Sequence, residues 1–286
     1  MGAGPSAGCI RREVPAKKIR KIQRGNPMRE EIHTIPVNDA FAADAECPVC
    51  YMYKTLEQHA IDFTMGPSYM EDDIRAKTDR LGFCDHHMRM MEQSGNKLGL
   101  ALMLHTHIVK TNRDTAKWMK TPAKAGGGLF RKKEETEDPL ISYLDEVNST
   151  CFVCDHIRMT FRWYLYTMVE MWKKDPEFRK KYQNSRGLCN EHLPEVLREG
   201  KKRLSAAEYA EFREESCALY HKNMERIADE LSWFIDKNDY RNADKPWKNS
   251  RDVLARAVVK TNGLLRVDPD TGEVLGVDRP PKNPEE

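Results

Sequence analysis

The sequence predicts an all-α protein of two pseudo-repeated helical lobes, each held by a metal site with three cysteine ligands and one histidine ligand. A pair of cysteine and histidine motifs occurs twice in the chain, at nearly the same spacing. Apolar residues recur at intervals of three and four after each motif, which is typical of helices packed in a bundle. Segments that alternate between apolar and polar residues are nearly absent, which argues against a sheet.

The chain begins with a basic arm, residues 1–27, which we expect to be disordered. Its cationic residues face a single acid and are Arg11, Arg12, Lys17, Lys18, Arg20, Lys21 and Arg24. Contact with nucleic acid through this arm is an alternative that the charge pattern leaves open. A more ordinary stretch begins at Met28, so the native start is either Met1 or Met28.

The repeated motif is a Cys-x-x-Cys followed by a Cys-x-x-His. The first copy comprises Cys47, Cys50, Cys84 and His87, and the second comprises Cys151, Cys154, Cys189 and His192. The copies stay in register, with 104 residues from Cys47 to Cys151 and 105 residues from Cys84 to Cys189. Because each copy supplies three thiolates and one imidazole, the sequence predicts two closed Cys3His sites, each formed within one copy.

Each ligand motif is expected to lie at the start of a helix, where free N–H groups favour the thiolate form of cysteine. The Cys-x-x-His motifs follow Gly82 and Gly187, which can adopt a positive φ and let the backbone approach the metal. Protein fills all four ligand positions, which leaves no open position for an activated water. This ligand set favours two zinc ions, with two iron–sulfur clusters as the alternative.

Four helices are predicted from apolar stripes that follow the motifs. Those after Cys-x-x-Cys carry Tyr53, Leu56, Ala60 and Phe63, and Ile157, Phe161, Leu165, Met168 and Trp172. Those after Cys-x-x-His carry Leu98, Leu102, His105 and Val109, and Cys217, Tyr220, Met224, Ile227, Leu231 and Phe234. We expect each stripe to be buried, with Cys217 and His105 in the core. His86 and His156, which lie beside ligands, are expected to support the ligands or to lie at the surface.

A glycine-rich and charged segment, residues 121–138, predicts a flexible linker between the lobes. The domains expected on either side of it are residues 28–120 and 139–263. Residues 264–286 form a tail in which 265–267 and 273–275 are compatible with a hairpin.

The composition is that of an ordinary soluble protein, with a net charge of +2, 40% hydrophobic residues and 32% charged residues. No global field strong enough to indicate nucleic acid or membrane follows from these values. The chain has no apolar run near the ~18 residues that span a bilayer, and it has no secretory signal. We therefore expect a cytoplasmic protein without membrane contact, whose cysteines stay reduced.

Several motifs resemble a bacterial family of unknown function that occurs mostly in anaerobic Gram-positive bacteria. The resemblance covers about residues 28–263 and is carried by residues 47–50, 70–75, 82–87, 96–103, 151–156, 239–242 and 246–252. It implies that Met28 resembles the usual start, and it implies no particular activity.

The resemblance draws attention to two polar clusters, which comprise Glu71, Asp72, Asp73 and Arg75, and Asp239, Tyr240, Arg241 and Asn242. One interpretation is a ligand pocket between the lobes, in which an arginine holds an anion. The other interpretation, which we favour, is capping and ion pairing at helix ends.

No nucleophile–base pair, phosphate-binding glycine loop or pair of catalytic carboxylates is recognisable, so the residues favour a protein that is not an enzyme. We expect a cytosolic metal-binding scaffold or adaptor whose partner is another protein. An electron-transfer or redox-sensor protein with two iron–sulfur clusters is the alternative.

Overall fold

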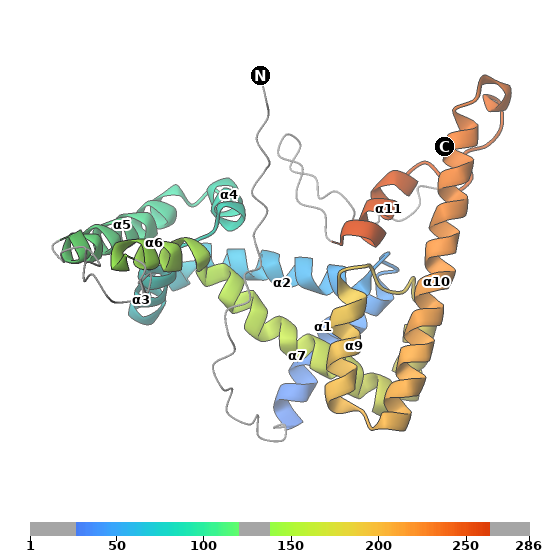
Figure 1. The fold of residues 1–286 in the computed structure, drawn as a ribbon, viewed down its shortest axis with the longest axis horizontal. Helices are drawn as coiled ribbons and strands as arrows, with labels where there is room; N and C mark the ends of the chain where they lie inside the picture. Colours follow the sequence, from blue (N-terminus) through green and yellow to red (C-terminus); the bar gives the residue numbers. More distant parts are fainter. Residues whose placement is uncertain (1–26, 120–137, 264–286) are drawn as a thin grey trace, which may run out of the picture. The chain divides into compact units, whose positions relative to one another are not determined.

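The computed structural model describes residues 27–119 and 138–263, and these residues form helices without any strand. The prediction of an all-α protein is therefore confirmed for the described residues (Figure 1). The α-helices are α1 (Pro27–Ala42), α2 (Pro48–Met65), α3 (Asp72–Leu81), α4 (Asp85–Gln93), α5 (Lys97–Met119), α6 (Pro139–Ser149), α7 (Phe152–Lys174), α8 (Pro176–Asn184), α9 (His192–Arg203), α10 (Ala206–Lys237) and α11 (Val253–Asn262). Two 3-10 helices, η1 (Pro67–Met70) and η2 (Tyr240–Asn242), complete the set.

The predicted basic arm, the linker and the tail hairpin lie outside the described residues, apart from the last position of each of the first two segments. No helix in the described ranges combines the length and the apolar character that crossing a membrane requires.

Two compact units divide the described residues. Unit 1 contains residues 57–119 and 138–159, and unit 2 contains residues 27–56 and 160–263. The division falls within α2 and within α7, so each unit includes residues from both copies of the ligand motif. The predicted domains, residues 28–120 and 139–263, stay a prediction about independent folding.

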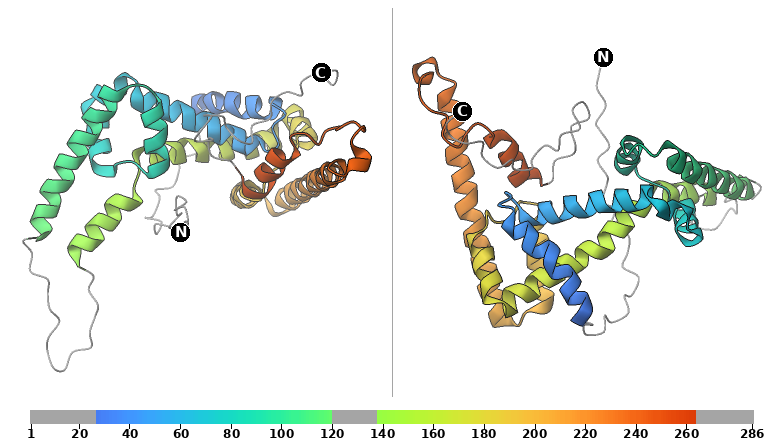
Figure 2. Two further views of the ribbon diagram at one scale, coloured as in Figure 1. Left: turned by 90° about the horizontal axis from the view of Figure 1, so that it is seen from above. Right: turned by 180° about the vertical axis from the view of Figure 1, so that it is seen from behind.

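In unit 1, α5 packs against α3, α4 and α6, and Figure 2 shows α5 and α6 side by side. The core of unit 1 includes Ile61, Met91 and Met103, which are almost fully buried. Methionine suits such a position because its flexible side chain fills irregular gaps between helices.

The predicted stripe on α5 is only partly correct. The helix exists, but Leu98 and Val109 are 68% and 53% exposed, and His105 is also exposed. The buried residues of α5 are instead Gly99, Leu100 and Met103, all in its first two turns. Helical spacing identified the helix correctly and its buried face wrongly, because several turns of α5 have apolar residues on more than one face.

In unit 2, α10 packs against α8, α9 and α11, and α1 packs against α8 (Figure 1). Aromatic rings fill the core: Phe41 lies edge-on to Phe178, and Trp172 lies edge-on to Phe212, with ring centroids 5.0 and 4.8 Å apart. Edge-to-face pairs of this kind add about 0.5–1.5 kcal/mol beyond the area that they bury. The predicted α7 stripe, which begins at Ile157 in unit 1 and continues to Trp172 in unit 2, is buried throughout.

The long helix α10 begins at a capping box, in which the Ser205 side chain accepts from the Glu208 N–H and the Glu208 side chain accepts from the Ser205 N–H. Its buried residues include Phe212, Ser216, Leu219, Asn223 and Ile227. The predicted stripe lies beside this face, and Ile227 is its only residue that is buried. Cys217, which we expected in the core, is half-buried. Polar side chains hid the true face: the Ser216 hydroxyl is satisfied by Tyr182 at 2.7 Å, and the Asn223 amide donates to the Leu219 carbonyl.

A buried carboxylate joins several elements of unit 2. The Glu46 side chain is fully buried and pairs with Arg186 at 3.0 Å, Arg226 at 2.5 Å, Arg256 at 3.4 Å and Lys260 at 3.7 Å. Burial alone would raise the pKa of Glu46, but hydrogen bonding and the cations, Arg226 foremost, lower it below its ordinary value. Glu46 therefore stays ionised and ties α10 and α11 to the turn before Cys47.

Replacing Glu46 by glutamine should lower the free energy of unfolding of unit 2 by about 3 kcal/mol, because it removes the carboxylate that balances the buried ammonium of Lys260. Urea unfolding followed by tryptophan fluorescence would measure the change. The matched control is Glu177→Gln, which removes an exposed carboxylate paired with Lys180 and should leave the midpoint nearly unchanged. Equal midpoints for Glu46→Gln and wild type would show that the cluster contributes nothing.

Candidate metal centres

The first ligand group lies in unit 2 and consists of Cys47, Cys50, Cys189 and His192, all buried. The Nδ1 atom of His192 lies 3.7 Å from the Cys47 sulfur, 3.3 Å from the Cys50 sulfur and 3.2 Å from the Cys189 sulfur. The sulfurs of Cys50 and Cys189 are 3.7 Å apart. These four donor atoms surround one point.

The second ligand group lies in unit 1 and consists of Cys84, His87, Cys151 and Cys154. The Nδ1 atom of His87 lies 3.3 Å from the sulfurs of both Cys84 and Cys154 and 3.4 Å from the Cys151 sulfur. The sulfurs of Cys84 and Cys154 are 3.8 Å apart. His87 and Cys151 are buried, whereas Cys84 and Cys154 are half-buried.

All eight predicted ligands are therefore brought into two Cys3His groups, but the predicted pairing was wrong. Each Cys-x-x-Cys joins the Cys-x-x-His of the other copy, not of its own. The intervening helices give the physical reason. The 18 residues of α2 and the 23 residues of α7 span about 27 and 35 Å, and each helix carries the chain out of one compact unit and into the other before the next motif is reached.

The four motifs share one backbone geometry at the start of a helical turn. The first cysteine of each motif accepts a hydrogen bond at its carbonyl from the N–H four residues later, at 2.9–3.1 Å; the donors are Tyr51, Met88, Asp155 and Leu193. Ligands at positions one and four then share a face, and the unpaired N–H groups of the helix start offset part of the thiolate charge.

The predicted positive φ is confirmed at both motif glycines, with φ of 58° at Gly82 and 72° at Gly187. A Cβ atom at Gly82 would lie 2.9 Å from the His107 ring, and a Cβ atom at Gly187 would lie 3.2 Å from the Leu219 carbonyl oxygen. Close packing thus adds to the backbone conformation in requiring glycine before each Cys-x-x-His.

The donor spacing fits one tetrahedral ion in each group. Bonds of about 2.3 Å to sulfur and about 2.0 Å to nitrogen place tetrahedral sulfurs about 3.8 Å apart and a sulfur about 3.5 Å from a nitrogen. The distances in both groups scatter around these values, from 3.2 to 3.8 Å. Each group can therefore hold a metal ion with little movement of its side chains.

Glu57 of α2 fixes the orientation of His87. Its Oε1 atom lies 3.1 Å from Nε2 of His87 and 3.0 Å from Nε2 of His86. This contact leaves Nδ1 of His87 for the metal and makes the imidazole a stronger donor. Burial by itself would raise the pKa of the Glu57 carboxyl, but the hydrogen bonds from His86 and His87 outweigh burial and lower the pKa to about 2.

His86 thus supports a ligand, as expected, through Glu57. His156 is exposed and stacks on Phe63 with ring centroids 5.2 Å apart. Sequence analysis missed Glu57, because a single glutamate within a helix carries no pattern that distinguishes it from a solvated one.

The two groups differ in the hydrogen bonds that join the residues flanking the first cysteine of Cys-x-x-Cys to the residues before Cys-x-x-His. In unit 1, the Phe152 N–H donates to the Gly82 carbonyl at 3.0 Å, and the Thr150 hydroxyl donates to the Leu81 carbonyl at 2.8 Å. The corresponding residues in unit 2 are Pro48, which has no N–H, and Glu46, which accepts only.

In unit 2, the buried ammonium of Lys260, from α11, joins the residue before Cys-x-x-Cys to a residue before Cys-x-x-His. It donates to the carbonyls of Glu46, at 2.6 Å, and Arg186. Burial lowers the pKa of Lys260, while Glu46 and the thiols of Cys47 and Cys189 counteract that shift. A cation therefore lies near the ligands of unit 2, where unit 1 has neutral donors.

The two polar clusters predicted as a possible ligand pocket make local contacts. Asp73 pairs with Lys77 at 2.9 Å, and Arg75 donates to Thr106 at 3.3 Å, while Glu71 precedes α3 as its N-cap residue. Asp239 accepts from the Arg241 N–H at the start of η2 and pairs with the Arg241 guanidinium. Tyr240 is 86% exposed, and Asn242 donates to the Asp236 carbonyl. Asp239 thus caps η2 and pairs with Arg241, whereas the Glu71 side chain makes no cap hydrogen bond and Arg75 contacts α5. A shared ligand pocket stays a prediction.

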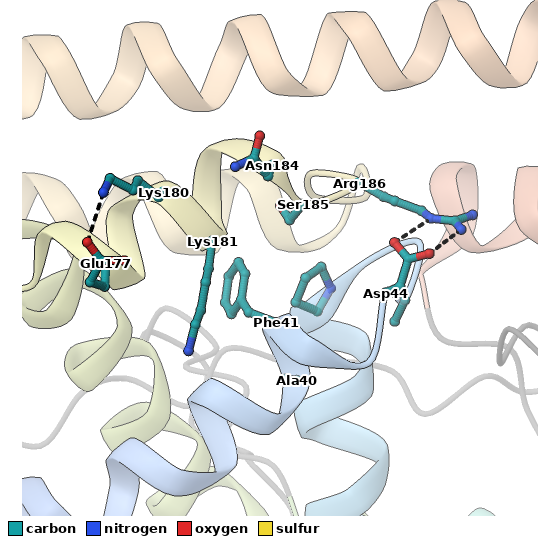
Figure 3. Close-up of a pocket in the computed structure, with 11 residues that line it drawn as sticks. Ala40, Phe41, Asp44, Glu177, Lys180, Lys181, Asn184, Ser185 and Arg186 are labelled. Carbon is teal, nitrogen blue, oxygen red and sulfur yellow. Dashed lines mark hydrogen bonds and ion pairs between the residues drawn. The ribbon is translucent and has the colours of Figure 1, made fainter. Parts of the chain in front are cut away.

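A surface pocket of about 310 Å³ lies in unit 2 between α1 and α8 (Figure 3). Phe41 and Pro48 form part of its wall. Each cation at this pocket already has a partner: Arg186 pairs with Asp44, Lys180 with Glu177, and Lys181 donates to Asn38. Two of these cations are therefore balanced by a carboxylate, whereas the Lys181 ammonium donates to a neutral amide.

Double substitutions distinguish crossed pairing from pairing within a copy. With crossed pairing, Cys50→Ser/Cys189→Ser should lose one ion per chain and keep the other, because both residues serve one group. Cys50→Ser/Cys84→Ser should lose both ions. Plasma mass spectrometry measures the number of metal ions per chain. Loss of both ions from Cys50→Ser/Cys189→Ser, and of one ion from Cys50→Ser/Cys84→Ser, would establish pairing within each copy.

Glu57→Gln should weaken metal binding in unit 1 by about 10–100-fold, because the glutamine no longer orients and polarises His87 as a carboxylate does. Competition with a chelator of known affinity measures the change. Metal binding in unit 2 is the internal control and should be unchanged. If the variant loses both ions at the same chelator concentrations as the wild-type protein, Glu57 has no influence on metal binding by His87.

The family comparison agrees with the motif evidence. None of the curated proteins and none of the solved structures matches the chain. A family model described as a family of unknown function, DUF6062, matches residues 28–268, a span that includes all eight ligands and Glu57. The chain belongs to this family of unknown function.

Proposed function

We propose that the protein is a cytoplasmic helical scaffold or adaptor in which two structural zinc ions hold the chain together. The observation that carries this proposal is the closed donor set: three sulfurs and one nitrogen surround a single point in each unit. Because protein fills every position of the shell, no position remains for a substrate or an activated water. The ions then act by stabilising structure, which is why we do not assign an enzymatic reaction.

The donor spacing favours single ions over iron–sulfur clusters. All four donor atoms in each group lie within 4.8 Å of one another, which matches one tetrahedral shell around one ion. The ligands of a cluster bind different iron atoms and are spread apart by the cluster itself. Cysteine with histidine in the ratio three to one is also an ordinary structural zinc set.

A protein partner is supported by the apolar surface of α5 and α6. Ile108, Met119 and Ile141 are 61%, 74% and 51% exposed, and α6, which the structure describes in full, has no buried residue. Contiguous exposed apolar surface is typical of sites that contact another protein, and α5 and α6 pack against each other. The basic arm, for which nucleic acid is the alternative partner, lies outside the described residues.

Protein purified without oxygen should be colourless and contain two zinc ions per chain, with no inorganic sulfide. Elemental analysis and a visible absorption spectrum make the measurement. Adding a strong chelator should unfold the helices around both sites, since the binding free energy of structural zinc is folding free energy. A brown preparation that contains iron and sulfide would replace the scaffold with the electron-transfer or sensor protein.

A further inference from the structure

Two metal groups with the same ligand set but different surroundings allow a comparison within one molecule. In unit 2, all four ligands are buried, and Cys47 and Cys189 are 1% and 0% exposed. In unit 1, Cys84 and Cys154 are half-buried, so this group is the more exposed of the two. Oxidation of cysteine follows exposure and thiolate character, and the first of these properties separates the groups.

Charged side chains lie near both groups. Three thiolates and a divalent ion carry a formal charge of −1. In unit 2, the buried ammonium of Lys260 bonds to the carbonyls of Glu46 and Arg186, and the carboxylate of Glu46, 3.7 Å away, balances its charge. In unit 1, the carboxylate of Glu57 bonds to the ligand His87 and adds to the negative charge. Exposure is therefore the property that distinguishes the thiolates of unit 1 from those of unit 2.

We propose that Cys84 and Cys154 form a modification site, at which a peroxide oxidises the two thiolates to a disulfide and thereby releases the metal ion of unit 1. This inference rests on the proposed function, since it requires a bound ion. The Cys84 and Cys154 sulfurs are 3.8 Å apart, so they need to approach by less than about 2 Å to reach the S–S bond length.

The chemistry balances with hydrogen peroxide as the oxidant. One thiolate attacks a peroxide oxygen, the O–O bond breaks, and the hydroxide that leaves takes up a proton to become water. The second thiolate attacks the sulfur of the sulfenic acid, the S–S bond forms, and hydroxide leaves and is protonated to a second water. The sulfurs are oxidised, the peroxide is reduced, and only Cys151 and His87 remain as ligands, too few to hold the ion.

The test uses the full-length protein with both zinc ions bound, treated with hydrogen peroxide in the presence of a chromogenic zinc indicator. One ion per chain should be released at least about tenfold faster than the other. Peptide mass spectrometry should find a disulfide between Cys84 and Cys154 while Cys47, Cys50 and Cys189 remain unmodified. Reduction with excess zinc should restore the second ion.

Single-site variants isolate the two groups. Cys50→Ser keeps the ion of unit 1 and should still release it, whereas Cys84→Ser keeps the ion of unit 2 and should resist the same peroxide. The wild-type peptide map decides the matter by itself if either variant does not fold. Equal release rates, earlier modification of the unit 2 cysteines, or oxidation of Cys84 and Cys154 without a disulfide would each overturn the inference. A starting preparation without zinc would instead contradict the proposed function.

Discussion

The structure depends on the convergence of four side chains on one point, which happens once in each unit. Three thiolates whose sulfurs lie within 4.8 Å of one another repel strongly in a buried site, and a bound cation removes that repulsion. Each group draws two ligands from either side of residues 121–138, so an ion in each group ties the two parts of the chain together. The helices are arranged around these two points, since each motif is also the start of a helical turn.

Loop-closure entropy is too small to dictate the pairing of the motifs. Crossed pairing joins residues up to 145 positions apart in unit 2 and about 70 apart in unit 1, whereas pairing within a copy would join Cys50 to Cys84, 34 positions apart. Each doubling of a loop adds only about 0.6 kcal/mol, so crossing adds about 2 kcal/mol in total. Structural zinc contributes about 10–16 kcal/mol per site. Helix packing therefore selects the partners.

Local features of the ligand motifs could be predicted from the sequence, whereas the pairing of the motifs could not. Ligand identity, helix starts at the motifs and the positive φ of Gly82 and Gly187 are local properties, and residue type with spacing predicted them correctly. The pairing of the motifs depends on where α2 and α7 lead the chain, and two copies with equal spacing contain no information about that. The buried face of α10 was also hidden, because Ser216 and Asn223 lie in the core with their hydrogen bonds satisfied.

The divergence of the two sites follows from the two positions that flank the first cysteine of each Cys-x-x-Cys motif. Unit 1 joins its motifs with the Thr150 hydroxyl and the Phe152 N–H. Glu46 and Pro48 supply neither donor, and a buried carbonyl without a donor is costly, so Lys260 of α11 donates in their place. Its buried charge needs a counter-charge, which Glu46 provides, and ionised Glu46 in turn binds Arg226 and Arg256. One change of backbone donor thus accounts for the docking of α11, the buried ion cluster and the cation beside the ligands, three features that distinguish unit 2 from unit 1.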